Sequence, residues 1–90
     1  MPYLVFTKHL QTFFPTLAEG DVAGATVREV IDELERRHPG IASYIIDETG
    51  RLRRHVNVFV GDEPIRDRAR LGDKLAPDDR VWIMQALSGG

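Results

Sequence analysis

Residues 24–40, GATVREVIDELERRHPG, carry the clearest secondary-structure pattern in the sequence. Apolar side chains recur at positions i, i+3, i+4 and i+7, and charged side chains fill the positions between them, as in a helix with one buried face. The apolar positions are Val27, Val30, Ile31 and Leu34, and the charged positions are Arg28, Glu29, Asp32, Glu33, Arg36 and Arg37. We therefore predict an amphipathic helix over this segment.

Both ends of this helix are marked by residues that commonly begin or end helices. Thr26 and Glu29 have the spacing of a capping box, in which a hydroxyl and a carboxylate each accept a hydrogen bond from a backbone N–H of the first turn. At the other end, Arg36 and Arg37 lie where the helix dipole favours positive charge. The Pro-Gly pair at 39–40 then stops further winding.

The remaining segments predict short strands around this helix. Residues 2–10, PYLVFTKHL, are rich in strand formers and apolar on both faces, which is typical of a central strand. Residues 17–24 predict a second strand and a turn, and residues 41–47 predict a short turn of helix that depends on tertiary packing. Residues 55–60, HVNVFV, and 76–87, APDDRVWIMQAL, show the two-residue alternation of strands.

This order of elements predicts an α+β fold. A weak edge segment, GDEP at 61–64, lies between the last two strands and consists of turn residues. Since one helix cannot cover both faces of the sheet, we expect it to pack on one face and to leave the other partly open to solvent.

Composition limits the classes of function. Ninety residues, 42% apolar and 29% charged, are typical of one globular domain and leave no room for a second. The net charge of −2 gives no field that would favour nucleic acid or an anionic membrane. The apolar runs are too short to span a bilayer and the start lacks the basic residues of a secretory signal, so we expect a cytoplasmic location.

Metal and thiol chemistry are also disfavoured. The absence of cysteine excludes Cys-based zinc sites, iron–sulfur sites and thiol nucleophiles. His9, His38 and His55 lack the spacing of metal ligands, so we expect no metal site. Two basic stretches, RLRRH at 51–55 and RDRAR at 66–70, are interpreted as solvated surface, although they could meet an acidic groove on a partner. Asp78 and Asp79 are interpreted as turn residues.

Several motifs together resemble a known family. TVREVIDELERRHPGI, VNVFVGDEPIR and LAPDDRVWIMQALSGG occur in the order found in the MoaD/ThiS sulfur carriers, and the match covers most of the chain from about Ala25 onward. The long connection HPGIASYIIDETGRLRRH is more similar to the molybdopterin synthase small subunit and the CysO-type carriers than to the thiamine type. The resemblance implies a ubiquitin-like β-grasp fold, with a mixed sheet of four to five strands, one main helix on one face and a flexible Gly-Gly tail.

The resemblance also assigns a role to the last residues. It implies a domain over residues 1–87 and a flexible reactive tail over 88–90, in which Gly89 and Gly90 can enter a narrow channel because glycine lacks a Cβ. A ubiquitin-activating-type enzyme would adenylate Gly90 with MgATP, and sulfur would then displace AMP to give a terminal thiocarboxylate. The chain would act as a cosubstrate with no bound cofactor rather than as an enzyme.

A partner-binding surface is expected beside this tail. Alternation along the last strand puts Trp82 and Met84 on one face and Val81 and Ile83 on the other. The resemblance places Val81, Ile83 and Val58 inward, so we predict that Trp82, Met84 and Phe59 face outward as a docking surface, with Leu87 and Ser88 continuing it toward the tail. The alternative is that these large side chains form the core and the valines lie outside.

Three functions remain open from the sequence. The first is sulfur donation to a cysteine-synthase-like enzyme, to the molybdopterin synthase large subunit or in tRNA thiolation. The second is protein modification, in which Gly90 is joined to lysines of other proteins. The third is a non-reactive interaction subunit whose tail occupies a cleft of a partner.

Overall fold

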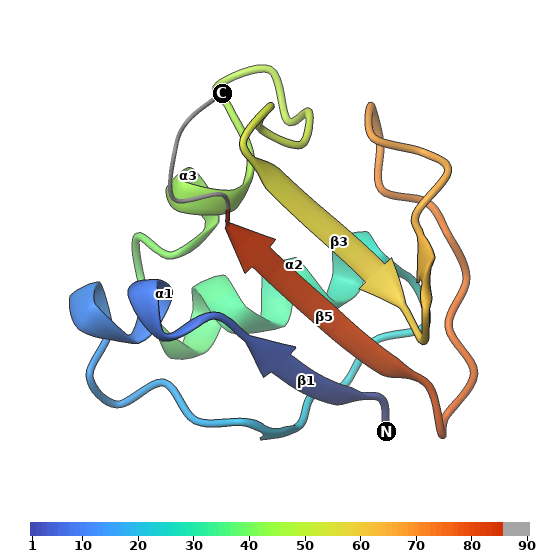
Figure 1. Ribbon diagram of the computed structural model, residues 1–90, viewed down its shortest axis with the longest axis horizontal. Helices are drawn as coiled ribbons and strands as arrows, with labels where there is room; N and C mark the ends of the chain where they lie inside the picture. The colour runs from blue at the N-terminus through green and yellow to red at the C-terminus, as the bar shows by residue number, and fades with distance from the viewer. Residues whose placement is uncertain (86–90) are drawn as a thin grey trace.

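The computed structural model describes residues 1–85 and contains a mixed sheet of five strands (Figure 1). In chain order the elements are β1 Tyr3–Phe6, α1 Lys8–Phe13, β2 Gly20–Asp21, α2 Val27–Arg37, α3 Ala42–Ile45, β3 Val56–Val60, β4 Glu63–Pro64 and β5 Arg80–Gln85. Helix α2 packs across the sheet, and α1 and α3 lie near one end of the strands (Figure 1). The predicted α+β class, the main helix and the order of the elements that follow it are confirmed.

The last strand lies in the middle of the sheet. The strand order is β2-β1-β5-β3-β4, and β5 runs parallel to β1 and antiparallel to β3. Because β5 has a hydrogen-bonded neighbour on each side, the chain is held firmly up to Gln85, which pairs with Val56 at the start of β3. The outermost strands, β2 and β4, have only two residues each, which leaves little unpaired edge.

Helix α2 has the buried apolar face and the side-chain cap that its sequence predicts. Val27, Val30, Ile31 and Leu34 are each 1% exposed and face the sheet. One half of the predicted capping box is present, since the Thr26 hydroxyl accepts a hydrogen bond from the Glu29 N–H at 3.2 Å. The Glu29 carboxylate accepts from the Ala25 N–H at 3.1 Å, one residue before the cap.

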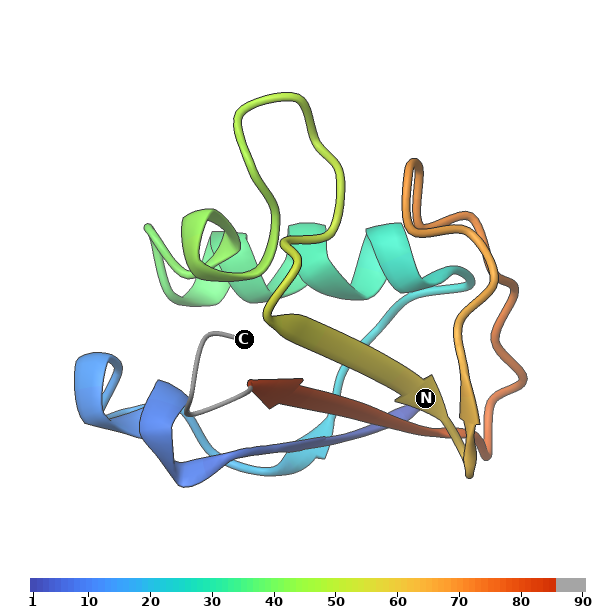
Figure 2. The same cartoon turned by 45° about the horizontal axis from the view of Figure 1, so that its top comes forward.

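The core lies between α2 and one face of the sheet. Figure 2 shows α2 and α3 on the same side of the strands. The sheet contributes alternate residues to this layer, so that Val56, Val58, Val81 and Ile83 are at most 3% exposed. Within residues 1–85, no helix combines the length and the apolar character needed to cross a membrane.

The first segment departs from the prediction. Strand β1 ends at Phe6, and residues 8–13, whose beginning was expected to continue the strand, form helix α1. No side chain caps this helix at Thr7, and Leu10 is its only buried residue. A six-residue helix of this kind is held by tertiary contact, which the local sequence pattern does not show.

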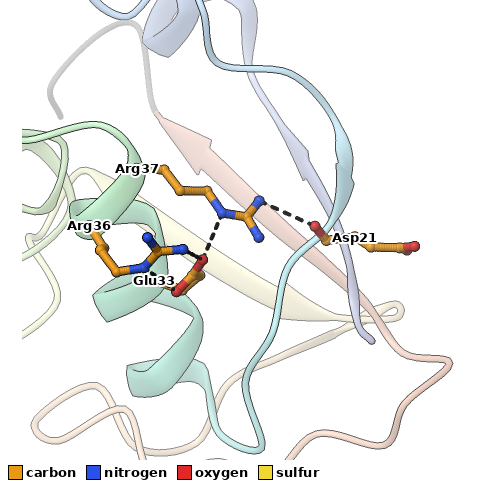
Figure 3. A network of polar contacts seen from close by, with 4 residues as sticks. All are labelled: Asp21, Glu33, Arg36 and Arg37. Atoms are coloured by element: carbon orange, nitrogen blue, oxygen red, sulfur yellow. Dashed lines mark hydrogen bonds and ion pairs between the residues drawn. The ribbon is translucent and has the colours of Figure 1, made fainter.

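A polar network joins α2 to the edge of the sheet (Figure 3). Arg36 and Arg37 both donate hydrogen bonds to the Glu33 carboxylate, and Arg37 also reaches the backbone carbonyl of Asp21 in β2 at 3.4 Å. Hydrogen bonds from Arg36 and then Arg37 lower the pKa of Glu33 to about 2. The group is at the surface, so the network fixes geometry more than it adds stability.

Candidate functional site

The two faces of β5 have different surroundings. Val81 and Ile83 belong to the core, whereas Trp82 and Met84 point to the opposite face of the sheet and are half-buried. Phe59 of β3 pairs with Trp82 and shares this outer face, also half-buried. The prediction that these three side chains face away from the helix is confirmed, and the alternative that they form the core is wrong.

The outer face is a packed surface rather than a set of isolated side chains. Trp82 lies opposite Val5 of the parallel strand β1 on one side and Phe59 of the antiparallel strand β3 on the other, so it has an apolar neighbour on each side. Val5 is outside the core cluster and is nevertheless only 9% exposed. We name Val5, Phe59, Trp82 and Met84 the outer-face patch.

Polar residues border this patch along the strands. Asn57, exposed, pairs with Met84 at one end of the sheet. At the other end Arg80 pairs with Tyr3, and its guanidinium carbon lies 5.1 Å from the centre of the Tyr3 ring. An apolar centre with a polar margin is the arrangement found in protein–protein interfaces.

The predicted reactive tail lies beyond the described part of the chain. Leu87, Ser88, Gly89 and Gly90, together with the predicted boundary at residue 87, fall outside residues 1–85. The last described residue, Gln85, is the end of β5, at the same end of the sheet as the start of β3 and the end of β1. Figures 1 and 2 place α1 and α3 at this end as well.

The titratable side chains of residues 1–85 do not gather into a buried or metal-binding site. None of the polar or charged residues in this range is buried, and no group of three His, Asp or Glu side chains is placed to hold a metal ion. His9 is in α1, His38 caps α2, and His55 precedes β3, so the fold does not bring the three together.

Two further carboxylates with lowered pKa values, Glu35 and Asp67, organise turns. The backbone N–H groups of Gly40 and Ala42 donate to Glu35 at 2.9 Å each, and these bonds lower its pKa. Hydrogen bonds from the Arg70 N–H and then the Gly72 N–H lower the pKa of Asp67 in the same way. A carboxylate held in its ionised form is a poor general acid at neutral pH, so these groups stabilise loops.

Asp79 serves the turn before β5, as predicted. Its carboxylate accepts a hydrogen bond from the Ala76 N–H at 2.7 Å, and its own N–H donates to the Ala76 carbonyl at 3.1 Å. Asp78 is exposed at the same turn.

The two basic stretches meet in the fold. The Leu52 N–H donates to the Arg68 carbonyl at 2.8 Å, and the Arg68 guanidinium donates to the carbonyls of Arg53 and Val56 at 2.8 and 2.9 Å. The interpretation as solvated surface is therefore wrong for Arg68, which is half-buried and joins the two stretches. Composition could not show this, because the acceptors are backbone carbonyls twelve to fifteen residues away.

An aromatic cluster between α1 and α3 was not anticipated. Phe13 stacks on Tyr44 with ring centroids 5.1 Å apart, His9 meets the edge of Phe13 at 5.4 Å, and Phe14 meets Tyr44 at 5.4 Å. In the sequence, the only local sign of this cluster is the pair of phenylalanines at 13–14. This pair does not show that Tyr44 is their partner.

Comparison with known proteins assigns a family to this fold. The sequence profile of the ThiS family matches residues 8–90, which is most of the chain. The chain belongs to the ThiS family. This ThiS-family chain is 39% identical over 75 residues to the sulfur carrier protein CysO of Mycobacterium bovis, a match that covers 81% of the chain and 76% of CysO. It is also 35% identical over 71 residues to small archaeal modifier protein 1 of Haloferax volcanii, covering 78% of the chain and 77% of that protein.

A solved structure supports the same assignment. The ThiS-family chain superposes with a TM-score of 0.85 on a chain in the crystal structure of the Amycolatopsis orientalis BexX/CysO complex, at 32% identity and over 100% of both chains. The predicted ubiquitin-like β-grasp fold is thus confirmed.

Proposed function

We propose that this chain is a sulfur carrier that acts through a thiocarboxylate at Gly90. The observation that carries the proposal is the family match over residues 8–90, which includes Gly89 and Gly90, together with relatives that are named sulfur carrier proteins. The position of β5 supports it, because a strand paired on both sides gives the following residues a rigid base.

The chemistry requires activation by another protein. A C-terminal carboxylate has a reference pKa of about 3.3–3.7, so at neutral pH it is an anion and a poor electrophile. In the proposed reaction the carboxylate oxygen attacks the α-phosphorus of MgATP in the partner's active site, which releases pyrophosphate and leaves an acyl adenylate. Sulfide then displaces AMP to give the thiocarboxylate, or a persulfide does so to give an acyl disulfide that a thiol must cleave.

The length and composition of the tail suit this role. Five residues, 86–90, follow Gln85, and when extended they span at most about 17 Å. Gly89 and Gly90 carry no side chain that could block a narrow channel leading to the nucleotide.

The outer-face patch is the proposed docking surface for the partner enzymes. It contains a phenylalanine, a tryptophan and a methionine, residue types that are enriched in protein–protein interfaces. Leu87 and Ser88 are proposed to continue this contact along the tail. The partners are a ubiquitin-activating-type adenylating enzyme and a sulfur-accepting enzyme of the cysteine-synthase or molybdopterin synthase class.

Intact mass spectrometry tests the proposal. After incubation with the adenylating enzyme, MgATP and sulfide, the chain should gain the mass difference between one sulfur and one oxygen atom. The matched control is the same chain extended by one residue after Gly90, which should remain unchanged. An unchanged wild-type mass, with the enzyme shown to hydrolyse or exchange ATP, contradicts the proposal.

A second candidate is protein modification through the same carboxylate. The relationship to small archaeal modifier protein 1 favours it. In this case an epitope-tagged chain produced in its native host should form Gly90-dependent conjugates, and mass spectrometry should find Gly-Gly remnants on lysines of other proteins. A third candidate, a subunit with a non-reactive tail, predicts instead that the one-residue extension keeps full function.

A further inference from the structure

Two exposed aromatic rings stand out at the end of the molecule from which the tail departs. Phe13 is 49% exposed and Tyr44 is 36% exposed, and the two rings are stacked. Within residues 1–85 the other exposed large apolar side chains are Met1 and Tyr3. Tyr3 pairs with Arg80 at the start of β5, so it lies at the opposite end of the strand from Gln85.

Backbone hydrogen bonds place α1, which carries Phe13, and α3, which carries Tyr44, near the end of β5. The Thr7 N–H donates to the Ile83 carbonyl, and α1 begins at the next residue, so its six residues, about 9 Å long, start beside β5. On the other side, the Ile45 carbonyl at the end of α3 accepts from the Arg53 N–H, close to Val56, the strand partner of Gln85. Figures 1 and 2 agree that α1 and α3 flank this end of the sheet.

The fold alone does not account for the exposure of these rings. Phe14 packs against the core and Leu10 is buried, so α1 is already attached to the body without Phe13. Tyr44 likewise follows the buried Ile41 and precedes the buried Ile45 in α3. Exposed apolar surface that packing does not require, gathered from two separate elements, is typical of a contact site.

We infer that Phe13 and Tyr44 contact the enzyme that adenylates Gly90, an inference that rests on the proposed function. The tail reaches at most about 17 Å from Gln85, so the active site that receives Gly90 must lie over this end of the molecule. An ordinary interface buries about 800 Å² per partner, which corresponds to a disc of roughly 16 Å radius. Because α1 begins one residue after Thr7, which is bonded to Ile83, and is about 9 Å long, a footprint of this size centred near Gln85 extends along α1 to Phe13 at its end.

Tyr44 is itself a chemical probe for this contact, because its phenol is 36% exposed. Nitration by tetranitromethane, followed by peptide mass spectrometry, reports the exposure of this phenol in the wild-type chain. With the adenylating enzyme and MgATP present, nitration of Tyr44 should slow relative to the chain alone. An unchanged Tyr44 rate overturns the inference.

Variants give a second, kinetic test. Phe13→Ser should raise the KM of ATP–pyrophosphate exchange for the carrier by roughly fivefold or more with kcat unchanged, as for an interface residue of ordinary weight. Asp32→Asn, exposed on α2 and thus on the opposite face of the sheet from the outer-face patch, should behave like the wild type. The melting temperature of each variant separates lost binding from lost folding, and the nitration result does not depend on any variant. A Phe13→Ser variant that is folded and has wild-type KM contradicts the inference.

The two proposals fail in different ways. If the wild-type chain supports neither pyrophosphate exchange nor thiocarboxylate formation, the proposed function is wrong and this inference with it. If the wild type is converted but the nitration rate of Tyr44 is unchanged and Phe13→Ser keeps the wild-type KM, the proposed function stands and the inference alone is wrong.

Discussion

Arg68 stabilises this fold through its hydrogen bonds rather than through pairing with an acid. Its half-buried guanidinium donates to the carbonyls of Arg53 and Val56, so it fixes the approach of the chain to β3. Arg68→Met should lower the free energy of unfolding by about 1–3 kcal/mol, because two carbonyls lose a charged donor. Arg70→Met, at an exposed side chain of the same stretch, is the control and should change stability by about 0.5 kcal/mol or less. Urea denaturation of both variants measures this, and equal losses would contradict the role given to Arg68.

Glu35 makes the turn after α2 sensitive to acid. Its pKa is lowered by the Gly40 and Ala42 N–H groups, so the folded state favours the ionised carboxylate. This contribution to stability is present above the unfolded pKa of about 4.3 and is lost as the pH falls through the lower folded pKa. Glu35→Gln should therefore be less stable than the wild type at pH 7, and the difference should shrink as the pH falls below about 4. Urea denaturation at several pH values checks this, and a pH-independent difference would contradict it.

At the scale of elements, the structure shows which strands and helices local sequence can predict. Helix α2 has eleven residues, a side-chain cap at Thr26 and an apolar face that is buried as a whole, so its pattern and its packing agree. Helix α1 has six residues, one buried side chain and no side-chain cap, and its first three residues lie in the segment predicted as strand. The two-residue β2 and β4 exist because neighbouring strands pair with them, and such pairing is decided by residues distant in the sequence.

The connection into α2 depends on the absence of a side chain at Gly24. A Cβ at this position would lie 2.8 Å from both the Val30 backbone nitrogen and the Val30 Cγ2 atom. Gly24→Ala should therefore move the connection away from the first turns of α2 and cost about 1–3 kcal/mol. A thermal melt, together with amide hydrogen exchange in α2, measures the effect. An unchanged melting temperature would show that the backbone shifts without cost.

For the whole molecule, parity along β5 divides the core side chains from the proposed docking surface. Strand period alone predicts that Val81 and Ile83 share one face and Trp82 and Met84 the other, but it does not decide which face is buried. The resemblance to the β-grasp carriers supplied that choice, and burial confirms it. The aromatic pair of Phe13 and Tyr44 could not be found in this way, because its members lie thirty-one positions apart and meet only after both helices have packed.

The adjacent residues Ile83 and Met84 test this division within one strand. Ile83 is 3% exposed in the core, so Ile83→Ala should cost about 2–5 kcal/mol through lost burial and the cavity that remains. Met84 is half-buried on the outer face, and Met84→Ala should cost clearly less. For the adenylating enzyme the order should reverse at a temperature where both variants are folded: Met84→Ala should raise the KM for the carrier, and Ile83→Ala should leave it near the wild-type value. Urea denaturation ranks the two variants by loss of stability, and pyrophosphate exchange ranks the same two variants by their KM. If stability and KM respond in the same order, the outer-face patch has no separate role in binding, because recognition would then follow only from how well the body is folded.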